Sequence, residues 1–118
     1  MAKILVVDDS EDLLEMITLL LKINGHAVAT SYNVPGTVKT IRTFSPDLII
    51  IDALLGSRSG RELCKQVRMY HPKMPIILMS ASPEQLKSYK DCKADAVIEK
   101  PFDVLMMNNT IDALLAIA

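Results

Sequence analysis

Short apolar runs alternate with longer stretches of helical period along the whole chain, and this alternation restricts the folds that it can adopt. Strands and helices in steady succession are typical of a parallel sheet, because each helix carries the chain back to the same end of the sheet. The run Leu48–Ile51 is apolar at every position, which predicts a central strand covered on both faces. The expected strands are Lys3–Val7, Ala27–Thr30, Leu48–Ile51, Ile76–Met79 and Ala96–Ile98.

Five helices are expected between and after these strands, with polar caps, Pro and Gly at their boundaries. They run from a Ser10 or Asp9 cap to Gly25, from about Val34 past Ile41, from Ser59 to Tyr70, from Pro83 to about Lys90, and from Asp103 to the C-terminus. Five strands and five helices fill the 118 residues, a common length for a single domain. We therefore expect residues 1–118 to form one α/β domain.

The composition argues against several classes of function. With 13 basic and 14 acidic residues the formal charge is −1, so a general attraction to nucleic acid or anionic lipid is not expected. No apolar run approaches the ~20 residues that span a bilayer. Cys64 and Cys92 are too few and too far apart in the sequence for a disulfide framework or a thiolate metal site. We expect a cytoplasmic protein with reduced cysteines and no direct contact with nucleic acid or membrane.

Polar residues follow four of the five expected strands. Asp8 and Asp9 come after the first strand, Asp52 after the third, Ser80 after the fourth and Lys100 just after the fifth. Right-handed connections place the C-terminal ends of parallel strands at one edge of the sheet, where open α/β sheets bind their ligands. Three carboxylates, a hydroxyl and an ammonium group are therefore expected to converge there.

This set of groups suits phosphoryl chemistry with a metal ion. Clustered carboxylates raise one another's pKa unless a cation lies among them, and Mg2+ prefers oxygen ligands. Lys100 supplies a positive charge and Ser80 a hydroxyl for phosphoryl oxygens, and a carboxylate beside the metal can attack phosphorus to form an acyl phosphate. Taken singly, the acidic residues could be helix caps or turn residues, Ser80 a turn residue and Lys100 a surface charge. Their shared place at the strand ends favours the site.

Four segments resemble the receiver domains of two-component response regulators, over nearly the whole chain. They read ILVVDDS at Ile4–Ser10, PDLIIID at Pro46–Asp52, PIILMSA at Pro75–Ala81 and EKPF at Glu99–Phe102. The resemblance implies a flavodoxin-like, doubly wound fold, with a five-stranded parallel sheet in the order 2-1-3-4-5 and five alternating helices. It also implies that the Lys100–Pro101 peptide bond is cis.

The resemblance further implies a role for each site residue. Asp52 would accept the phosphoryl group, Ser80 would be the hydroxyl that moves toward it, and Lys100 would be its ionic partner. From this role, Lys100 is expected to matter more for switching than for stability. The implied Mg2+ ligands are Asp9, Asp8 acting through water, Asp52 and the carbonyl of Leu54.

Four features depart from the pattern of this family. One is that Ser82 and Leu54, which flank the expected path of hydrolytic water, carry neither acid nor amide. The loop after Asp52 reads Gly56-Ser57-Arg58-Ser59-Gly60 in place of a Pro followed by Asp-Gly, which predicts a looser loop. Val97 replaces the usual aromatic residue, so we expect the signal to pass mainly through backbone shifts of the Ser80–Glu84 loop. Lys93 replaces a frequent Gly and is strained if its φ is positive.

Three functions compete on this sequence. The first is a phospho-accepting switch, which receives its phosphoryl group from a sensor histidine kinase or a histidine phosphotransfer protein and acts on an effector domain or protein. Its only chemistry would be self-phosphorylation and autodephosphorylation. The second is a receiver-like interaction module that works without phosphorylation, which predicts loss of acidic or Lys positions that are all present here. The third is a phosphatase of the haloacid-dehalogenase type, which would place an Asp where this chain has Leu54.

Two side-chain patterns on the helices also carry expectations. The basic residues of the third helix are expected to form a solvated face, with a docking surface as the alternative. The methionines are expected to fill the core. The residues concerned are Arg58, Arg61, Lys65 and Arg68 in the first pattern, and Met16, Met69, Met79 and Met107 in the second.

Overall fold

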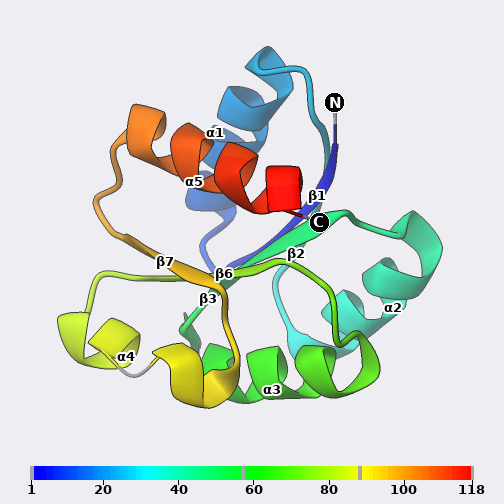
Figure 1. Cartoon of the computed structure of the whole chain (residues 1–118), viewed down its shortest axis with the longest axis vertical. Helices are drawn as coiled ribbons and strands as arrows, with labels where there is room; N and C mark the ends of the chain where they lie inside the picture. The colour runs from blue at the N-terminus through cyan, green and yellow to red at the C-terminus, as the bar shows by residue number, and fades with distance from the viewer. Residues whose placement is uncertain (1, 57, 88, 118) are drawn as a thin grey trace.

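A sheet of five parallel strands forms the centre of the molecule (Figure 1). The computed structural model describes residues 2–56, 58–87 and 89–117. The strands are β1 (Lys3–Val7), β2 (Ala27–Ser31), β3 (Leu48–Asp52), β6 (Ile76–Ser80) and β7 (Ala96–Glu99), and they lie in the order β2-β1-β3-β6-β7. Counted along the chain, these five strands have the predicted order 2-1-3-4-5, so the predicted sheet is confirmed.

Helices cover both faces of this sheet (Figure 1). α1 (Glu11–Ile23) and α5 (Val104–Ile117) pack on one face. α2 (Val34–Phe44), α3 (Gly60–Tyr70) and α4 (Pro83–Lys87) pack on the other. Side chains alternate along each strand, so that Ile4 and Val6 of β1 join the first layer while Leu5 and Val7 join the second. The central strands β3 and β6 are buried at every position, as strands covered on both faces must be.

Serine caps fix the start of the two helices nearest to the C-terminal edge of the sheet. The Ser10 hydroxyl accepts a hydrogen bond from Leu13 N at 3.3 Å, and the Ser59 hydroxyl accepts one from Glu62 N at 3.3 Å. These bonds pair amide groups that the first turn of a helix leaves free. The segments between the strand ends and these two caps carry part of the candidate site.

The fourth helix is shorter than the sequence predicts. α4 ends at Lys87 rather than near Lys90, and a 3-10 turn, η1 (Tyr89–Cys92), follows. The tighter winding brings the Cys92 side chain into the core against α3. Lys93 then has a φ of 68°, in the left-handed region that the missing glycine would have adopted more easily.

After Asp52, the strands β4 (Leu54–Leu55) and β5 (Arg58–Ser59) form a short antiparallel ladder in the loop that the sequence predicts to be looser than in the family. A ladder of two residues per strand is too short to leave a periodic signal in the sequence. Met79 and Met107 are buried as predicted, but Met16 and Met69 are exposed on α1 and α3. Within the described ranges, no helix is both long enough and apolar enough to cross a membrane.

Candidate functional site

The residues predicted from the strand ends do meet at one edge of the sheet. Asp52 ends β3 and Ser80 ends β6, while Asp8 and Asp9 follow β1 and Lys100 follows β7. Hydrogen bonds between neighbouring strands continue past the strand ends and hold them together. Ala53 N donates to Met79 O at 2.8 Å, Asp8 N to Ser31 O at 3.2 Å and Lys100 N to Ser80 O at 2.9 Å.

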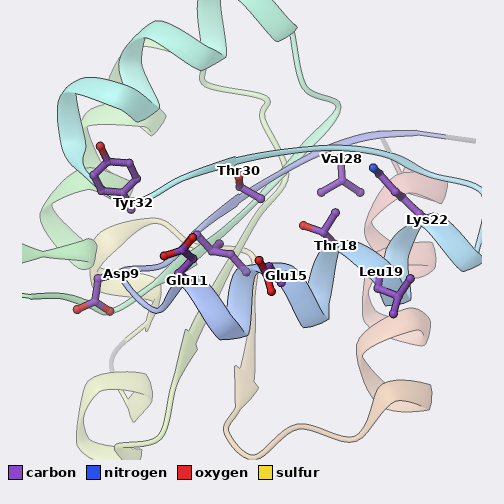
Figure 2. A pocket seen from close by; sticks show the side chains of 10 residues that line it. Asp9, Glu11, Glu15, Thr18, Leu19, Lys22, Val28, Thr30 and Tyr32 are labelled. Carbon is purple, nitrogen blue, oxygen red and sulfur yellow. The ribbon is translucent and has the colours of Figure 1, made fainter.

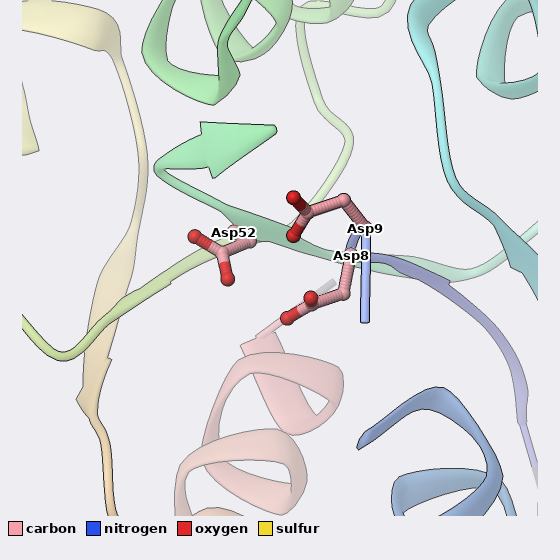
Figure 3. A group of neighbouring side chains, drawn as sticks. All are labelled: Asp8, Asp9 and Asp52. Atoms are coloured by element: carbon pink, nitrogen blue, oxygen red, sulfur yellow. The ribbon is translucent and has the colours of Figure 1, made fainter. Parts of the chain in front are cut away.

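Three carboxylates converge within this edge (Figure 3). One oxygen from each of Asp8, Asp9 and Asp52 lies within 4.8 Å of the others. Asp8 is fully buried and Asp52 is 5% exposed, whereas Asp9 is exposed. The acidic cluster is therefore buried on the side of Asp8 and Asp52 and open to solvent on the side of Asp9.

Lys100 lies between the two buried carboxylates. Its Nζ donates to Asp8 Oδ2 at 2.9 Å and forms a short ion pair with Asp52 Oδ2. The Lys100–Pro101 peptide bond is cis, which confirms the expectation from the family resemblance. Burial lowers the pKa of Lys100, but the hydrogen bonds to Asp52 and Asp8 outweigh this effect and leave its pKa raised. The lysine is therefore a fixed cation of the site.

Asp8 shows that one lysine does not neutralise the cluster. Burial is the largest cause that raises the pKa of its carboxyl group, and the neighbouring Asp52 raises it further. The bonds from Lys100 and from Ser10 N, at 2.8 Å to Oδ1, lower it without reversing the shift. The site thus carries more negative charge than its own cation compensates.

These residues fit a hard divalent cation. Carboxylate oxygens are the ligands that Mg2+ prefers, and a second positive charge would relieve the repulsion that raises the pKa of Asp8. Leu54, whose carbonyl is the remaining predicted ligand, lies beside Asp52, and its amide donates to Asp52 Oδ1 at 2.8 Å. Its role as a ligand stays a prediction.

A pocket of about 410 Å³ gives access to the Asp52 carboxylate. Ser80 and Ser82 line it on the β6 side, and Leu54, with 49% of its surface exposed, forms part of the opposite wall. The Ser80 hydroxyl accepts a hydrogen bond from Ser82 N at 3.0 Å. In this bond the hydroxyl is the acceptor, so its O–H could donate to an oxygen of an anion in the pocket.

The structure requires glycine at position 60, next to Asp52. A Cβ on Gly60 would lie 1.7 Å from the backbone oxygen of Asp52, and Gly60 N donates to Ala53 O at 2.8 Å. The first residue of α3 is therefore packed directly against the end of β3. The sequence signals this only through the presence of the glycine.

A second groove adjoins the site between α1 and β2 (Figure 2). Asp9 and Tyr32 lie at one end and Lys22 at the other, while Val28 and Thr30 of the edge strand line its wall. Asp9 borders both this groove and the pocket above Asp52. The sequence predicted no groove at this place.

A doubly wound sheet whose C-terminal edge gathers acidic residues, a lysine and a serine is typical of receiver domains. The chain belongs to the response regulator receiver domain family, whose pattern it matches over residues 4–112. It is thus the receiver domain of a two-component response regulator, a signalling domain rather than a conventional enzyme.

Known proteins agree with this assignment. The chain is 33% identical over 115 residues to the alkaline phosphatase synthesis transcriptional regulatory protein PhoP of Bacillus subtilis, covering 96% of this chain and 48% of that protein. The chain therefore spans about half the length of this relative. A putative response regulator from Chloroflexus aurantiacus superposes with a TM-score of 0.91 at 26% identity, covering 98% of both chains. The response regulator TrrA of Thermotoga maritima, in complex with Mg2+ and BeF, superposes with a TM-score of 0.89 at 26% identity, covering 97% of this chain and 99% of that one.

Proposed function

We propose that the chain, folded as one receiver domain over residues 1–118, accepts a phosphoryl group on Asp52 in a Mg2+-dependent reaction. The observation that carries the proposal is the position of the Asp52 carboxylate, which pairs with Lys100, lies within 4.8 Å of oxygens of Asp8 and Asp9, and lines the pocket. The donor would be the phosphohistidine of a sensor histidine kinase or of a histidine phosphotransfer protein.

The chemistry follows from the partners of the two carboxylate oxygens. Leu54 N holds Oδ1 and Lys100 holds Oδ2, so the carboxylate is already oriented before a donor arrives. An oxygen of Asp52 would attack phosphorus as the bond from phosphorus to the donor imidazole nitrogen breaks, and the nitrogen keeps the electron pair of that bond. Lys100 would then exchange its bond to Asp52 for a bond to a phosphoryl oxygen.

The acidic residues would supply the metal site for this transfer. Asp9 and Asp52 would bind Mg2+ directly, Asp8 through water, and the Leu54 carbonyl would complete the protein ligands. When bound, the metal neutralises charge on the acceptor and on the incoming phosphoryl group. The known complex of TrrA with Mg2+ and BeF supports this part of the proposal.

The response would begin at Ser80. Its hydroxyl would leave Ser82 N and donate to the phosphoryl group, which changes the start of the loop toward α4. A downstream effector domain or protein would read this change. The alternative, an interaction module that works without phosphorylation, retains no support from the site, because the acceptor, the lysine and the acidic pair are all in place.

Phosphorylation by a small-molecule donor tests the proposal directly. The protein is incubated with acetyl phosphate and Mg2+, and its intact mass is compared with that of Asp52→Asn and of the control Asp12→Asn, which removes an exposed carboxylate of α1. We expect one phosphoryl group on the wild type and on the control, none on Asp52→Asn, and none on any protein once the metal is chelated. Equal uptake by Asp52→Asn would refute the assignment of the acceptor.

A further inference from the structure

One face of α3 holds the segment that follows β6. This segment, which we name the strap, consists of α4 (Pro83–Lys87) and η1 (Tyr89–Cys92). Three α3 side chains spaced three and four residues apart, and therefore on one side of the helix, donate to backbone carbonyls in or just after the strap. The bonds are Arg61 Nη1 to Gln85 O at 2.6 Å, Cys64 Sγ to Cys92 O at 3.0 Å, and Arg68 Nε and Nη2 to Lys93 O at 3.1 and 3.0 Å.

These contacts correct the solvated face expected for the basic residues of α3. The Arg68 side chain is 16% exposed and also pairs with Asp95, and Arg61 is engaged by the strap. Lys65 keeps the expected solvated character, because it lies on the exposed side of the helix and pairs only loosely with Glu62, at 3.5 Å. One side of α3 therefore binds the strap, and the side that carries Lys65 faces solvent.

The strap needs external partners because its helices are short. A helix leaves its last four carbonyls without partners, and α4 is only five residues long. The guanidinium group of arginine carries several donors in a fixed plane and suits such carbonyls well. α3 thus supplies the hydrogen bonds that the strap cannot make within itself.

The acceptor site reaches α3 through the backbone. Gly60 begins the helix, and its Cα packs so closely against the Asp52 carbonyl that no side chain fits between them. A shift of the backbone at Asp52 must therefore move the first turn of α3. Arg61 follows Gly60 directly, so such a shift would also move its guanidinium group, which donates to Gln85 O.

A second line of contacts starts from Ser80 and ends at the same residue. Ser82 N donates to Ser80 Oγ at 3.0 Å, and Ser82 O accepts from Gln85 N at 3.1 Å. Gln85 is therefore held at its amide through Ser82 and at its carbonyl by Arg61. Both lines from the acceptor site meet at this one peptide position of α4.

We propose that Arg61 is a positioning residue that couples the acceptor site to the strap. In this chain α3 would transmit the signal that an aromatic side chain at the Val97 position of β7 transmits elsewhere in the family. Val97 occupies the β7 position and is 36% exposed, with no side chain long enough to move between surface and interior. The trigger of this coupling rests on the proposed phosphorylation of Asp52. The attachment of the strap to α3 does not.

Amide exchange and NMR shifts of four proteins test the coupling. They are the wild type, Arg61→Met, Arg61→Lys and the control Lys65→Met, which removes a cation from the solvated side of the same helix. In the free proteins we expect strap amides to exchange about tenfold faster in Arg61→Met, because the variant loses the charge-assisted hydrogen bond to Gln85 O. Lys65→Met should exchange like the wild type, and Arg61→Lys should recover part of the protection because a cationic donor remains.

Beryllofluoride with Mg2+ then serves as the probe of the activated state. In Arg61→Met the shifts near Asp9, Ala53 and Ser80 should match the wild type, while those of Glu84–Leu86 should fall to less than half. A purely structural role of Arg61 would change exchange but leave the beryllofluoride shifts of Glu84–Leu86 at wild-type size, and this result would overturn the coupling.

The remaining outcomes are also decisive. If Arg61→Met exchanges like Lys65→Met, the strap is not held by Arg61 and the inference is wrong. If Arg61→Met does not fold, Arg61→Lys carries the same comparison, since weaker shifts at Glu84–Leu86 are still expected. If the wild type shows no response near Asp52, the proposed function fails and the coupling with it, while the exchange ratio still decides the attachment of the strap.

Discussion

Replacing Lys100 by Met removes the cation between two buried carboxylates and keeps most of the side-chain volume. Asp8 is fully buried, Asp52 is 5% exposed and the Lys100 side chain is 20% exposed. Removing one partner of a buried ion pair costs about 3–5 kcal/mol. Since Lys100 keeps some contact with water, we take the lower end, about 3 kcal/mol, against a total of roughly 5–15 kcal/mol for a domain. This cost revises the sequence-based expectation that Lys100 matters little for stability.

Mg2+ and pH should both reduce this loss. A metal ion that binds only the folded state stabilises it by mass action, and it replaces the missing positive charge. The pKa of Asp8 is already raised above 3.8 in the folded protein and should rise further without Lys100. The folded state then binds more protons than the unfolded state, so the stability of the variant increases as pH falls from 7 through the folded pKa of Asp8 toward 3.8.

Urea unfolding followed by circular dichroism measures these effects, with and without Mg2+ at pH 7 and pH 5. We expect Lys100→Met to lose about 3 kcal/mol, or roughly 10 °C in melting temperature, in metal-free buffer at pH 7, and clearly less in the other three conditions. Lys65→Met, which removes an exposed lysine, should stay within about 0.5 kcal/mol of the wild type. The reasoning is refuted if the two variants lose equal stability, or if the loss at Lys100 is the same with and without Mg2+.

Three further predictions concern the same edge of the sheet. Asp8→Asn should stabilise the metal-free protein at pH 7, because it removes a desolvated carboxylate. The gain should shrink as pH falls through the raised pKa of Asp8, and denaturation curves at several pH values would show a constant gain if the argument is wrong. Gly60→Ala should destabilise the fold by about 1–3 kcal/mol and reduce phosphoryl uptake, because the added Cβ meets the backbone oxygen of Asp52. The intact mass after acetyl phosphate treatment measures the uptake, and unchanged uptake would contradict the close packing. Val97→Ala should leave the beryllofluoride shifts of the Ser80–Glu84 loop at wild-type size, and their loss in NMR spectra would show that β7 does act as a lever.

The strand ends were predictable because parallel strands with right-handed connections must end at one edge. That rule brings Asp8, Asp52 and Lys100 together without knowledge of any contact. It does not say that Lys100 bonds to both carboxylates, because those contacts join residues 92 and 48 positions apart and depend on how the strand ends pack. The sequence predicted that Lys100 relieves the repulsion among the acidic residues, and the structure supplied the two bonds through which it does so.

The strap was missed for a different reason. The pattern after Pro83 predicts a helix reaching about Lys90, but the structure divides this segment into α4 and η1. Local pattern measures how well a segment forms a helix by itself, whereas the 3-10 turn η1 also depends on tertiary packing, in which Cys92 is buried against α3. The sequence likewise predicts that arginines on a helix are solvated, because it does not show which backbone carbonyls of other segments lie within hydrogen-bond distance of them.

The sequence alone determined the alternation of strands and helices, the central place of Leu48–Ile51 and the edge at which the polar residues gather. These features depend on periodicity and chirality, which are local properties repeated along the chain. The tertiary structure decided which side of α3 binds the strap and which side is solvated. It also decided how Lys100 bonds to both Asp8 and Asp52, and how Arg61 and Ser82 bond to Gln85. Each of these depends on distances between segments that are far apart in the chain, and such distances are fixed only when the packed layers come together.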